Sequence, residues 1–480
     1  MGELGGFIKV HRVDFDKRDP RERVRDYKQY FHTQPDGELQ RQGGRCMDCG
    51  VPFCHEGCPL GNLIPDWNDL VYRGDWKQAI EQIELGIIER AWAEGWVVAE
   101  PPDERTGKTI GVVGSGPAGL AVADQLNRAG HSVTVYERDE GPGGLLRFGV
   151  PDAKLEKWII DRRVDVLAEE GVEFVYSCDV GRDLTAEELR SRHDAVVVAI
   201  GSRVHRDLEV PGRELEGVHF AMDYLYQRNR HVAALEGRPS PQPERPIVAE
   251  GKHVVVVGGG DTGMDCISNA IREGAVDVRM LDVYPELPPS GRPDNTPWPL
   301  PPKRTLTTYA LDEGGQREWN AEVIELCGEE GRVTRARARA VEGTSSRDLR
   351  PVPGTENEMP ADLVLIAIGF SHPEHAGLVD QLGVDLDARG NVKASVYETS
   401  AQGVFACGDA RVGQSLVVTA IAEGRKCARM VDRHLMGEPE FELEPEDQAT
   451  ITDAHFLELE AQTAGTVTVS DEFFSGPGDP

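Results

Sequence analysis

Four cysteines stand within thirteen residues near the beginning of the chain, at Cys46, Cys49, Cys54 and Cys58. Their spacing is C-x2-C-x4-C-x3-C-P, and its last part matches the end of a ferredoxin cysteine run. In two-cluster ferredoxins the cysteine before the proline ligates the other cluster. By that geometry Cys46, Cys49 and Cys54 form three corners of one [4Fe–4S] cluster and Cys58 serves a second. Each cluster would then need thiolates from elsewhere.

A glycine-rich turn between two short apolar segments indicates a second kind of chemistry. Residues 110–113 predict a strand, residues 114–119 (GSGPAG) a tight turn and residues 120–128 an amphipathic helix. A further strand, 132–136, ends in Glu137. In such a βαβ unit glycine lets the backbone approach a pyrophosphate, the helix N-terminus offers free N–H groups, and the carboxylate takes ribose hydroxyls. The unit predicts a bound dinucleotide.

The same pattern occurs again at "KHVVVVGGGDTGMDCISNAIREGAVDVRMLDVYP". Residues 254–257 predict the strand, Gly258, Gly260 and Gly263 the turn, and residues 264–272 the helix. The next strand ends at Asp282. Two such units in one chain predict two bound dinucleotides.

Three further strands are expected to end near glycines, at Gly201, Gly369 and Gly408. Asp409 follows the last of them and precedes a long helix, so its carboxylate could fix the hydroxyls and ring edge of a flavin. We expect FAD at the first unit and a nicotinamide nucleotide at the second, stacked for hydride transfer. The predicted fold is α/β, with two Rossmann-like domains, the nicotinamide domain inserted in the FAD domain, after a helical cysteine-rich domain. The expected ranges are 1–105 (cysteine-rich), 106–216 and 362–437 (FAD), 217–361 (nicotinamide) and 438–480 (acidic, disordered tail).

Composition limits the other possibilities. A chain of 480 residues is long for one core, so two or three domains are expected. The net charge of −31 argues against a nucleic-acid partner, whose phosphates would repel the chain. No apolar run approaches the roughly 18 residues needed to span a bilayer, and the N-terminus lacks the apolar core of a secretory signal. We therefore expect a cytoplasmic protein without a membrane partner, where clustered cysteines indicate metal or redox chemistry.

Six stretches resemble the small (beta) subunit of glutamate synthase. The resemblance runs from near the N-terminus to about Gly437, and the stretches are "CMDCGVPFCHEGCPLGNLIPDWNDLVYRGDWKQAI", "GWVVAEPPDERTGKTIGVVGSGPAGLA", "GGLLRFGVPDAKLEK", "VVVVGGGDTGMDC", "DNTPWPLPPK" and "GVFACGDARVGQSLVVTAIAEGRKCAR".

This resemblance implies an electron-input subunit. NAD(P)H would give a hydride to FAD, and electrons would pass through iron–sulfur centres to a large (alpha) subunit that makes glutamate from glutamine and 2-oxoglutarate. No side chain needs to act as an acid or base, because the cofactors carry the chemistry. The cofactor-binding residues that we expect are Gly114, Gly116, Pro117, Ala118, Gly119, Glu137, Gly144, Leu145, Arg147, Val180, Gly258, Gly260, Asp261, Thr262, Asp282, Gly369, Gly408, Asp409, Ser415, Leu416 and Val417.

The choice between NADH and NADPH stays open at this point. Asp282 ends a strand where an acid prefers a free 2′-hydroxyl and repels a 2′-phosphate. Arg279, Arg292, Lys303 and Arg304 are close enough in sequence to reverse that preference. Asp282 could equally be a solvated loop acid.

The cysteine quartet also has alternatives. The family carries a second quartet, but here residues 75–80 run directly into "EQIELGIIERAWAEGW", so a segment of the family is absent. The four thiols could hold one [4Fe–4S] cluster, bind Zn²⁺, or stay vacant. Two alternative functions follow: the flavin subunit of another ferredoxin- or pyrimidine-linked NAD(P)H oxidoreductase, or a non-catalytic flavoprotein assembly subunit with a zinc-bound N-terminus.

Overall fold

The computed structural model describes residues 2–13, 16–50, 52, 54, 58–79, 85–238, 240–288, 309–343 and 348–437. The expected acidic tail, 438–480, lies outside these residues. So do the proline-rich stretch 294–303 and the basic residues Arg292, Lys303 and Arg304.

A seven-stranded sheet forms the centre of the first unit, in the order β14-β15-β16-β4-β1-β2-β3. Its strands β16, β4, β1, β2 and β3 run parallel, and β14 and β15 add an antiparallel edge. Val112 and Val197 are completely buried, because helices cover both faces of the sheet. The strands are β1 Thr109–Val113, β2 Ser132–Tyr136, β3 Glu173–Val175, β4 Ala195–Val198, β14 Ala394–Ser395, β15 Glu398–Thr399 and β16 Val404–Ala406.

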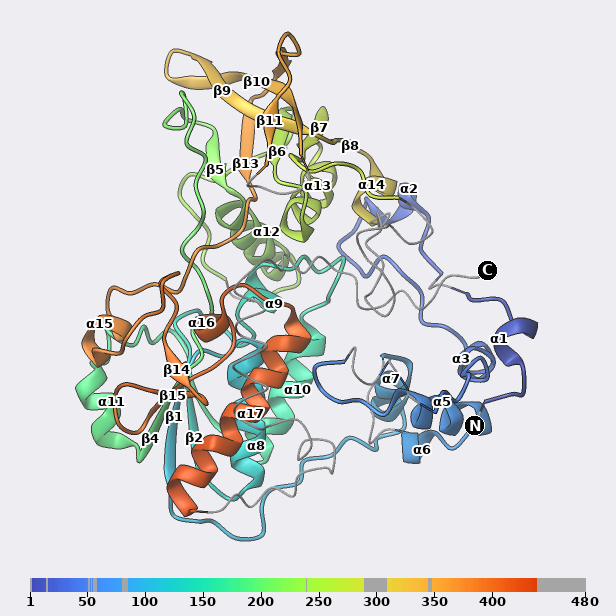
Figure 1. The fold of residues 1–480 in the computed structure, drawn as a ribbon, viewed down its shortest axis with the longest axis vertical. Coiled ribbons are helices and arrows are strands. Elements are labelled where there is room, and N and C mark those ends of the chain that lie inside the picture. Colours follow the sequence, from blue (N-terminus) through green and yellow to red (C-terminus); the bar gives the residue numbers. More distant parts are fainter. Residues whose placement is uncertain are drawn as a thin grey trace.

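Helices on the two faces of this sheet come from distant parts of the sequence (Figure 1). On one face α17 packs against α8 so closely that a Cβ at Gly424 would lie 2.3 Å from the carbonyl oxygen of Ala118. A glycine is therefore required where the two helices cross. The helices of this unit are α8 Pro117–Arg128, α9 Leu145–Phe148, α10 Trp158–Glu169, α11 Ala186–Arg192, α15 Leu378–Leu382, α16 Asp409–Val412 and α17 Val417–Met436.

A five-stranded parallel sheet forms the second unit, in the order β5-β13-β6-β7-β8. Its helices are α12 Ala221–Leu235, α13 Asp261–Glu273 and α14 Tyr309–Glu313. An antiparallel sheet, which the sequence analysis did not predict, packs on the opposite face through residues such as Val323 and Val333. The strands are β5 Val218–Phe220, β6 His253–Val257, β7 Asp277–Leu281, β8 Gln316–Glu318, β9 Ala321–Glu329, β10 Arg332–Glu342, β11 Arg350–Pro351, β12 Asn357–Pro360 and β13 Leu363–Ile366.

Strand β13 corrects the expected boundary between the two units. We expected the first unit to resume at residue 362, but β13 pairs with β6 from Leu363↔Val254 to Ile366↔Val257 and with β5 on its other side. The buried strand β6 needs a parallel neighbour on each side to satisfy its backbone, and β13 supplies one of them. The chain therefore returns to the first unit only after this strand.

The part before β1 is helical, as expected, and lies to one side of the two sheets (Figure 1). Trp67, Val71, Trp76 and Ile87 form its small core. Its helices are α1 Gly6–Lys9, α2 Pro20–Arg23, α3 Asp36–Gly43, α5 Ile64–Arg73, α6 Trp76–Ala79 and α7 Leu85–Ala93.

The segment around Arg23 and Tyr30, which we call the N-terminal arm, holds this helical part against the second unit. Arg23 is completely buried, and its Nε lies 2.7 Å from a carboxylate oxygen of Glu313. The ring of Tyr30 stacks on that of Tyr309 at 4.6 Å, and its backbone N–H donates to the carbonyl of Ala153 at 2.9 Å. The arm thus contacts both α14 and the segment that follows α9.

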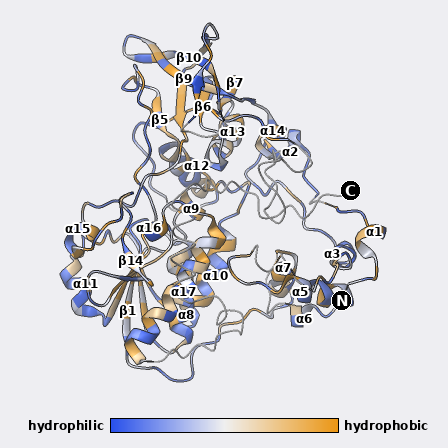
Figure 2. Cartoon of the chain, in the orientation of Figure 1, coloured by the Kyte–Doolittle hydropathy of each residue, from blue (hydrophilic) through white to orange (hydrophobic). Residues whose placement is uncertain are grey.

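Apolar residues concentrate inside the sheets. Figure 2 shows hydrophobic residues along strands such as β5 and β6, whereas the outer helix α11 is largely hydrophilic. None of the described helices is both long and apolar enough to cross a bilayer.

Replacing Arg23 with methionine should lower the free energy of unfolding by about 3 kcal/mol, because removing one partner of a buried ion pair leaves charge uncompensated. Arg272 still contacts Glu313, so the lower end of the usual range applies. The matched control is Arg332→Met, whose pair with Glu216 is exposed and should contribute less than about 1 kcal/mol. Equal shifts of the urea midpoint in both variants would contradict the role of the arm.

Candidate functional site

The first glycine turn is closed on one side and open on the other. Gly114 has φ +103°, and a Cβ there would lie 2.4 Å from the carbonyl oxygen of Ala199. A Cβ at Gly119 would lie 1.9 Å from the carbonyl oxygen of Gly114. At Gly116, by contrast, no heavy atom of the described residues lies within 4 Å of the Cβ position. The turn therefore packs tightly against the sheet and leaves space above Gly116 for a bound ligand.

The residues that follow the turn begin α8 and contact the end of β16. Pro117 is the first helical residue, where a missing N–H costs nothing. Gly408 has φ +63°, and a Cβ there would lie 2.7 Å from the Cβ of Ala118. The predicted residues of the first turn and of the Gly408–Asp409 segment are thus brought together.

Glu137 directly follows β2 and is buried beside this turn. Its Oε2 accepts hydrogen bonds from the backbone N–H of Ser115 at 3.0 Å and from its hydroxyl at 2.5 Å. Its Oε1 accepts from the N–H of Asp139 at 2.9 Å. The sequence analysis did not single out Ser115, although its place between two turn glycines was the signal.

The segment 144–147 approaches the first turn from another side. Gly144 has φ +52°, and a Cβ there would lie 3.1 Å from the Cα of Gly116. Leu145 begins α9. Arg147 turns away from the turn and pairs with Asp161 and with the carbonyl of Pro142. Of the three predicted residues, Gly144 therefore contacts the turn, Leu145 packs against the core of the second unit, and Arg147 is engaged inside its own unit.

The next predicted residues are Asp409 and those at the beginning of α17. Asp409 Oδ1 accepts a hydrogen bond from the Ser415 hydroxyl at 2.6 Å. Burial raises the pKa of Asp409 to about 6. Leu416 is the N-cap of α17 and Val417 its first residue, and among the described residues no side chain caps this end of the helix. The first turn of α17 thus offers free donors next to a carboxyl group.

Two other predicted residues lie on either side of this region. Val180 is buried in the core of the first unit with Leu184, so its side chain serves packing. Gly369, just after β13, has φ +88°, and a Cβ there would lie 2.8 Å from Oε1 of Gln414. That same oxygen accepts a hydrogen bond from the N–H of Phe370 at 2.9 Å. The end of β13 therefore contacts the segment that leads into α17.

The second glycine turn repeats the geometry of the first. Gly258 has φ +116°, and a Cβ there would lie 2.3 Å from the carbonyl oxygen of Ala367. A Cβ at Gly263 would lie 2.5 Å from the carbonyl oxygen of Gly258. In the part of the chain that the structure describes, the Cβ position of Gly260 again has no heavy atom within 4 Å. Both turns thus have one packed and one open side.

Lys154 links the segment after α9 to the helix that follows the second turn. It follows α9, and its Nζ lies 3.2 Å from Oδ1 of Asp261, the first residue of α13, and 3.4 Å from Oδ1 of Asp265. Burial alone would lower the pKa of Lys154, but the carboxylates of Asp265 and Asp261 raise it above its usual value. Burial raises the pKa of Asp265 to about 6. Thr262 lies in the same helical turn, so the predicted residues of the second turn face the segment after α9.

Asp282 directly follows β7, but it is not a solvated loop acid. It is buried, and its Oδ2 accepts a hydrogen bond from Nη2 of Arg317 at 2.6 Å. Arg317 lies on β8, and the sequence analysis did not identify it.

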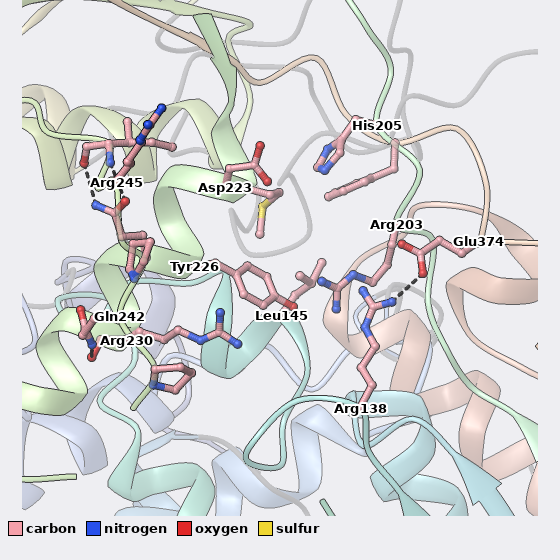
Figure 3. A pocket seen from close by; sticks show the side chains of 16 residues that line it. Arg138, Leu145, Arg203, His205, Asp223, Tyr226, Arg230, Gln242, Arg245 and Glu374 are labelled. Carbon is pink, nitrogen blue, oxygen red and sulfur yellow. Dashed lines mark hydrogen bonds and ion pairs between the residues drawn. The ribbon is translucent and has the colours of Figure 1, made fainter. Parts of the chain in front are cut away.

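A cavity of about 570 Å³ lies between the two units, and Leu145 is the predicted residue among those that line it. Tyr226 stands at its centre, with Arg203 over its ring at 4.9 Å and Arg230 at 5.5 Å. Figure 3 shows these two arginines entering from opposite sides of the tyrosine. Arg138 pairs with Glu374 at 2.6 Å. Four arginines (Arg138, Arg203, Arg230 and Arg245) and two acids (Asp223 and Glu374) are among the lining residues, so the charged groups of the wall carry an excess of positive charge.

The four N-terminal cysteines lie between α3 and α5. Cys46 and Cys58 are half-buried, and Cys49 and Cys54 are exposed. Burial raises the pKa of the Cys46 thiol. Within the described parts of the chain, no three His, Cys, Asp or Glu side chains are grouped closely enough to hold a metal. The donor chemistry fits a thiolate-bound cluster, but the described geometry does not gather the sulfurs.

Comparison with known proteins identifies the family. Residues 108–298 and 309–424 match the model described as pyridine nucleotide-disulphide oxidoreductase, and residues 23–86 match dihydropyrimidine dehydrogenase domain II, 4Fe-4S cluster. The chain is 46% identical to the glutamate synthase (NADPH) small chain of Mycobacterium tuberculosis, over 91% of this chain and 97% of that one. The chain belongs to the glutamate synthase small-chain family. The Bacillus subtilis member is 40% identical, over 91% of this chain and 99% of that one.

A solved structure shows the same fold. Mycobacterium tuberculosis FprA in complex with NADPH aligns with a TM-score of 0.54 at 18% identity, over 74% of this chain and 90% of FprA. The matches confirm the predicted α/β fold class and the predicted family.

The raised pKa of Asp409 predicts a pH dependence of stability in the flavin-free protein. The carboxyl ionises near pH 4 in the unfolded chain but only near pH 6 in the fold, so the stabilisation is complete below pH 4 and is lost as the pH rises through 6. Asp409→Asn should remove about 1–3 kcal/mol of this dependence in urea titrations from pH 4 to 7. A variant with the wild-type slope would contradict the assignment.

Proposed function

We propose that this glutamate synthase small chain is an electron-input subunit, which oxidises NAD(P)H with FAD and passes electrons toward its cysteine-rich part. The observation that carries the proposal is the contact of Lys154 with Asp261, because it places the segment after Gly144 against the first turn of α13. Two ligands held by the two turns would then share one space. When bound, the flavin supplies two-electron uptake from the nicotinamide and one-electron release.

The first unit has the features of the FAD site. The open face above Gly116 accommodates a pyrophosphate, and α8 directs its free N–H groups there. Glu137 is fixed by Ser115 next to the turn and accepts from hydroxyl donors. Asp409 and the first turn of α17 offer a carboxyl group and free donors for the flavin end. We assign FAD to the parts that build the first sheet and the nicotinamide nucleotide to the inserted second unit.

For the cysteine-rich part we propose a single [4Fe–4S] cluster on Cys46, Cys49, Cys54 and Cys58. The other five cysteines lie in the two nucleotide-binding units, and three of them are buried there. Four thiolates complete one cube at most. In support, the alignments with the two relatives extend over 480 and 495 positions yet cover 91% of this chain, so both relatives contain residues without a counterpart here.

The proposed partner is a glutamate synthase large subunit. The relatives are named small chains, which supports a larger companion that uses the electrons. There the electrons would serve glutamate formation from glutamine and 2-oxoglutarate.

Adding NAD(P)H under anaerobic conditions should bleach the visible flavin band of the purified protein. Gly260→Val is the sharp control, because its side chain would fill the open face of the second turn without touching the first. This variant should keep its FAD and be bleached by dithionite, while its reduction by NAD(P)H slows by roughly 100-fold. Wild-type protein that binds FAD but is not bleached would favour the non-catalytic alternative.

Metal analysis decides the cluster proposal. We expect about four iron and four sulfide per chain, lost together in Cys49→Ser. Cys178→Ser is the matched control, since this half-buried thiol lies in the first unit. About eight iron per chain, or zinc in place of iron, would contradict the proposal.

A further inference from the structure

The environment of Asp282 differs from that of Glu137, the acid at the equivalent place in the first unit. An acid there is expected to bind the ribose hydroxyls of the nucleotide. In both acids one oxygen accepts from the N–H two residues on, which for Asp282 is Oδ1 with Tyr284 at 3.0 Å. The difference lies at the other oxygen, because Oδ2 of Asp282 accepts from the guanidinium of Arg317 at 2.6 Å. A Cβ at Gly259 would lie 1.9 Å from Oδ2, so the carboxylate is packed under the glycine turn. Asp282 thus serves as an anchor.

What it anchors is a guanidinium group at the edge of the second turn. Arg317 donates from Nη2 to the carbonyl of Gly259 at 3.0 Å as well as to Asp282. Its Cζ lies 3.5 Å from the centre of the Trp319 ring, and its side chain is 13% exposed. Nε is buried and has no acceptor among the residues that the structure describes. The group is held in one orientation, with donor capacity left over.

We propose that Arg317, oriented by Asp282 and Trp319, recognises the 2′-phosphate of NADPH and makes this chain selective for NADPH over NADH. Nη1 of Arg317 is not among its buried atoms and makes no hydrogen bond with the described residues, so it can donate a strong, charge-assisted hydrogen bond to phosphate while Nη2 holds Asp282 and Gly259. Because Arg317 neutralises Asp282, the carboxylate no longer repels a 2′-phosphate at this place. This inference rests on the proposed binding of a nicotinamide nucleotide at the second turn.

The neighbouring cation of β7 does not offer the same feature. Arg279 donates to Asp277 at 2.9 Å and to Glu318 at 3.5 Å. Two acids therefore occupy it, and no contact with the glycine turn is recorded for it among the described residues. This makes Arg279 a matched control on the adjacent strand.

Fragment binding tests the inference on the FAD-loaded full chain. Calorimetry with 2′,5′-ADP and with 5′-AMP separates recognition of the 2′-phosphate from binding of the adenosine. Arg317→Ala should weaken 2′,5′-ADP by about 10- to 100-fold, as expected for hydrogen bonds to a charged group, and leave 5′-AMP within about threefold. Arg317→Lys, which keeps the charge but loses the fork, should lie between. Arg279→Ala should change neither fragment.

Flavin reduction gives a second measurement. The preference for NADPH over NADH in anaerobic bleaching should fall in Arg317→Ala by the same factor as the fragment ratio. Asp282→Asn, which keeps an acceptor for Arg317, should not selectively weaken 5′-AMP or NADH. Equal loss of both fragments in Arg317→Ala, selective loss of 5′-AMP in Asp282→Asn, or a wild-type preference for NADH would overturn the inference. If neither nucleotide bleaches the wild-type flavin while the fragment pattern holds, the proposed function fails and this inference stands.

Discussion

The contact between Lys154 and the first turn of α13 determines how the two nucleotide-binding units face each other. The lysine belongs to the first unit and the two carboxylates that it contacts belong to the second. Asp265 is buried and needs such a partner, because an unpaired carboxylate inside the protein is costly. Tyr30 of the N-terminal arm also contacts the segment after α9, through Ala153, so the arm attaches the cysteine-rich part to the same junction.

The glycine turns of the two units have the same backbone arrangement. In each, the first and third glycines allow the turn to pack on the sheet and helix, and the middle glycine leaves its outer face free. The acids that follow differ in their partners. Glu137 accepts from the uncharged donors of Ser115, whereas Asp282 is neutralised by Arg317. The two turns are alike in backbone and therefore differ chiefly in the electric field around them.

Features encoded within a few consecutive residues could be predicted from the sequence. The turns, the strands that lead into them and the acids that follow them depend on local spacing, and the structure places them as expected. Arg317 could not be found in this way, because β8 reaches Asp282 only through parallel pairing with β7. The membership of β13 was misjudged for a related reason, since an apolar run does not reveal which sheet it joins. The antiparallel sheet and the anchoring of Arg23 to Glu313 also depend on contacts between distant segments.

The strand order of the first sheet has a consequence for biosynthesis. Strand β4 is paired on one side with β1, but its other neighbour, β16, and the helix that covers α8 are encoded near the end of the described chain. As the polypeptide leaves the ribosome, the whole second unit, including β13, emerges before β16 and α17 do. The inserted unit is thus able to finish folding while the surrounding one still has an unpaired edge and an uncovered helix. The nucleotide-binding unit that begins first in the sequence is the last to be completed during translation.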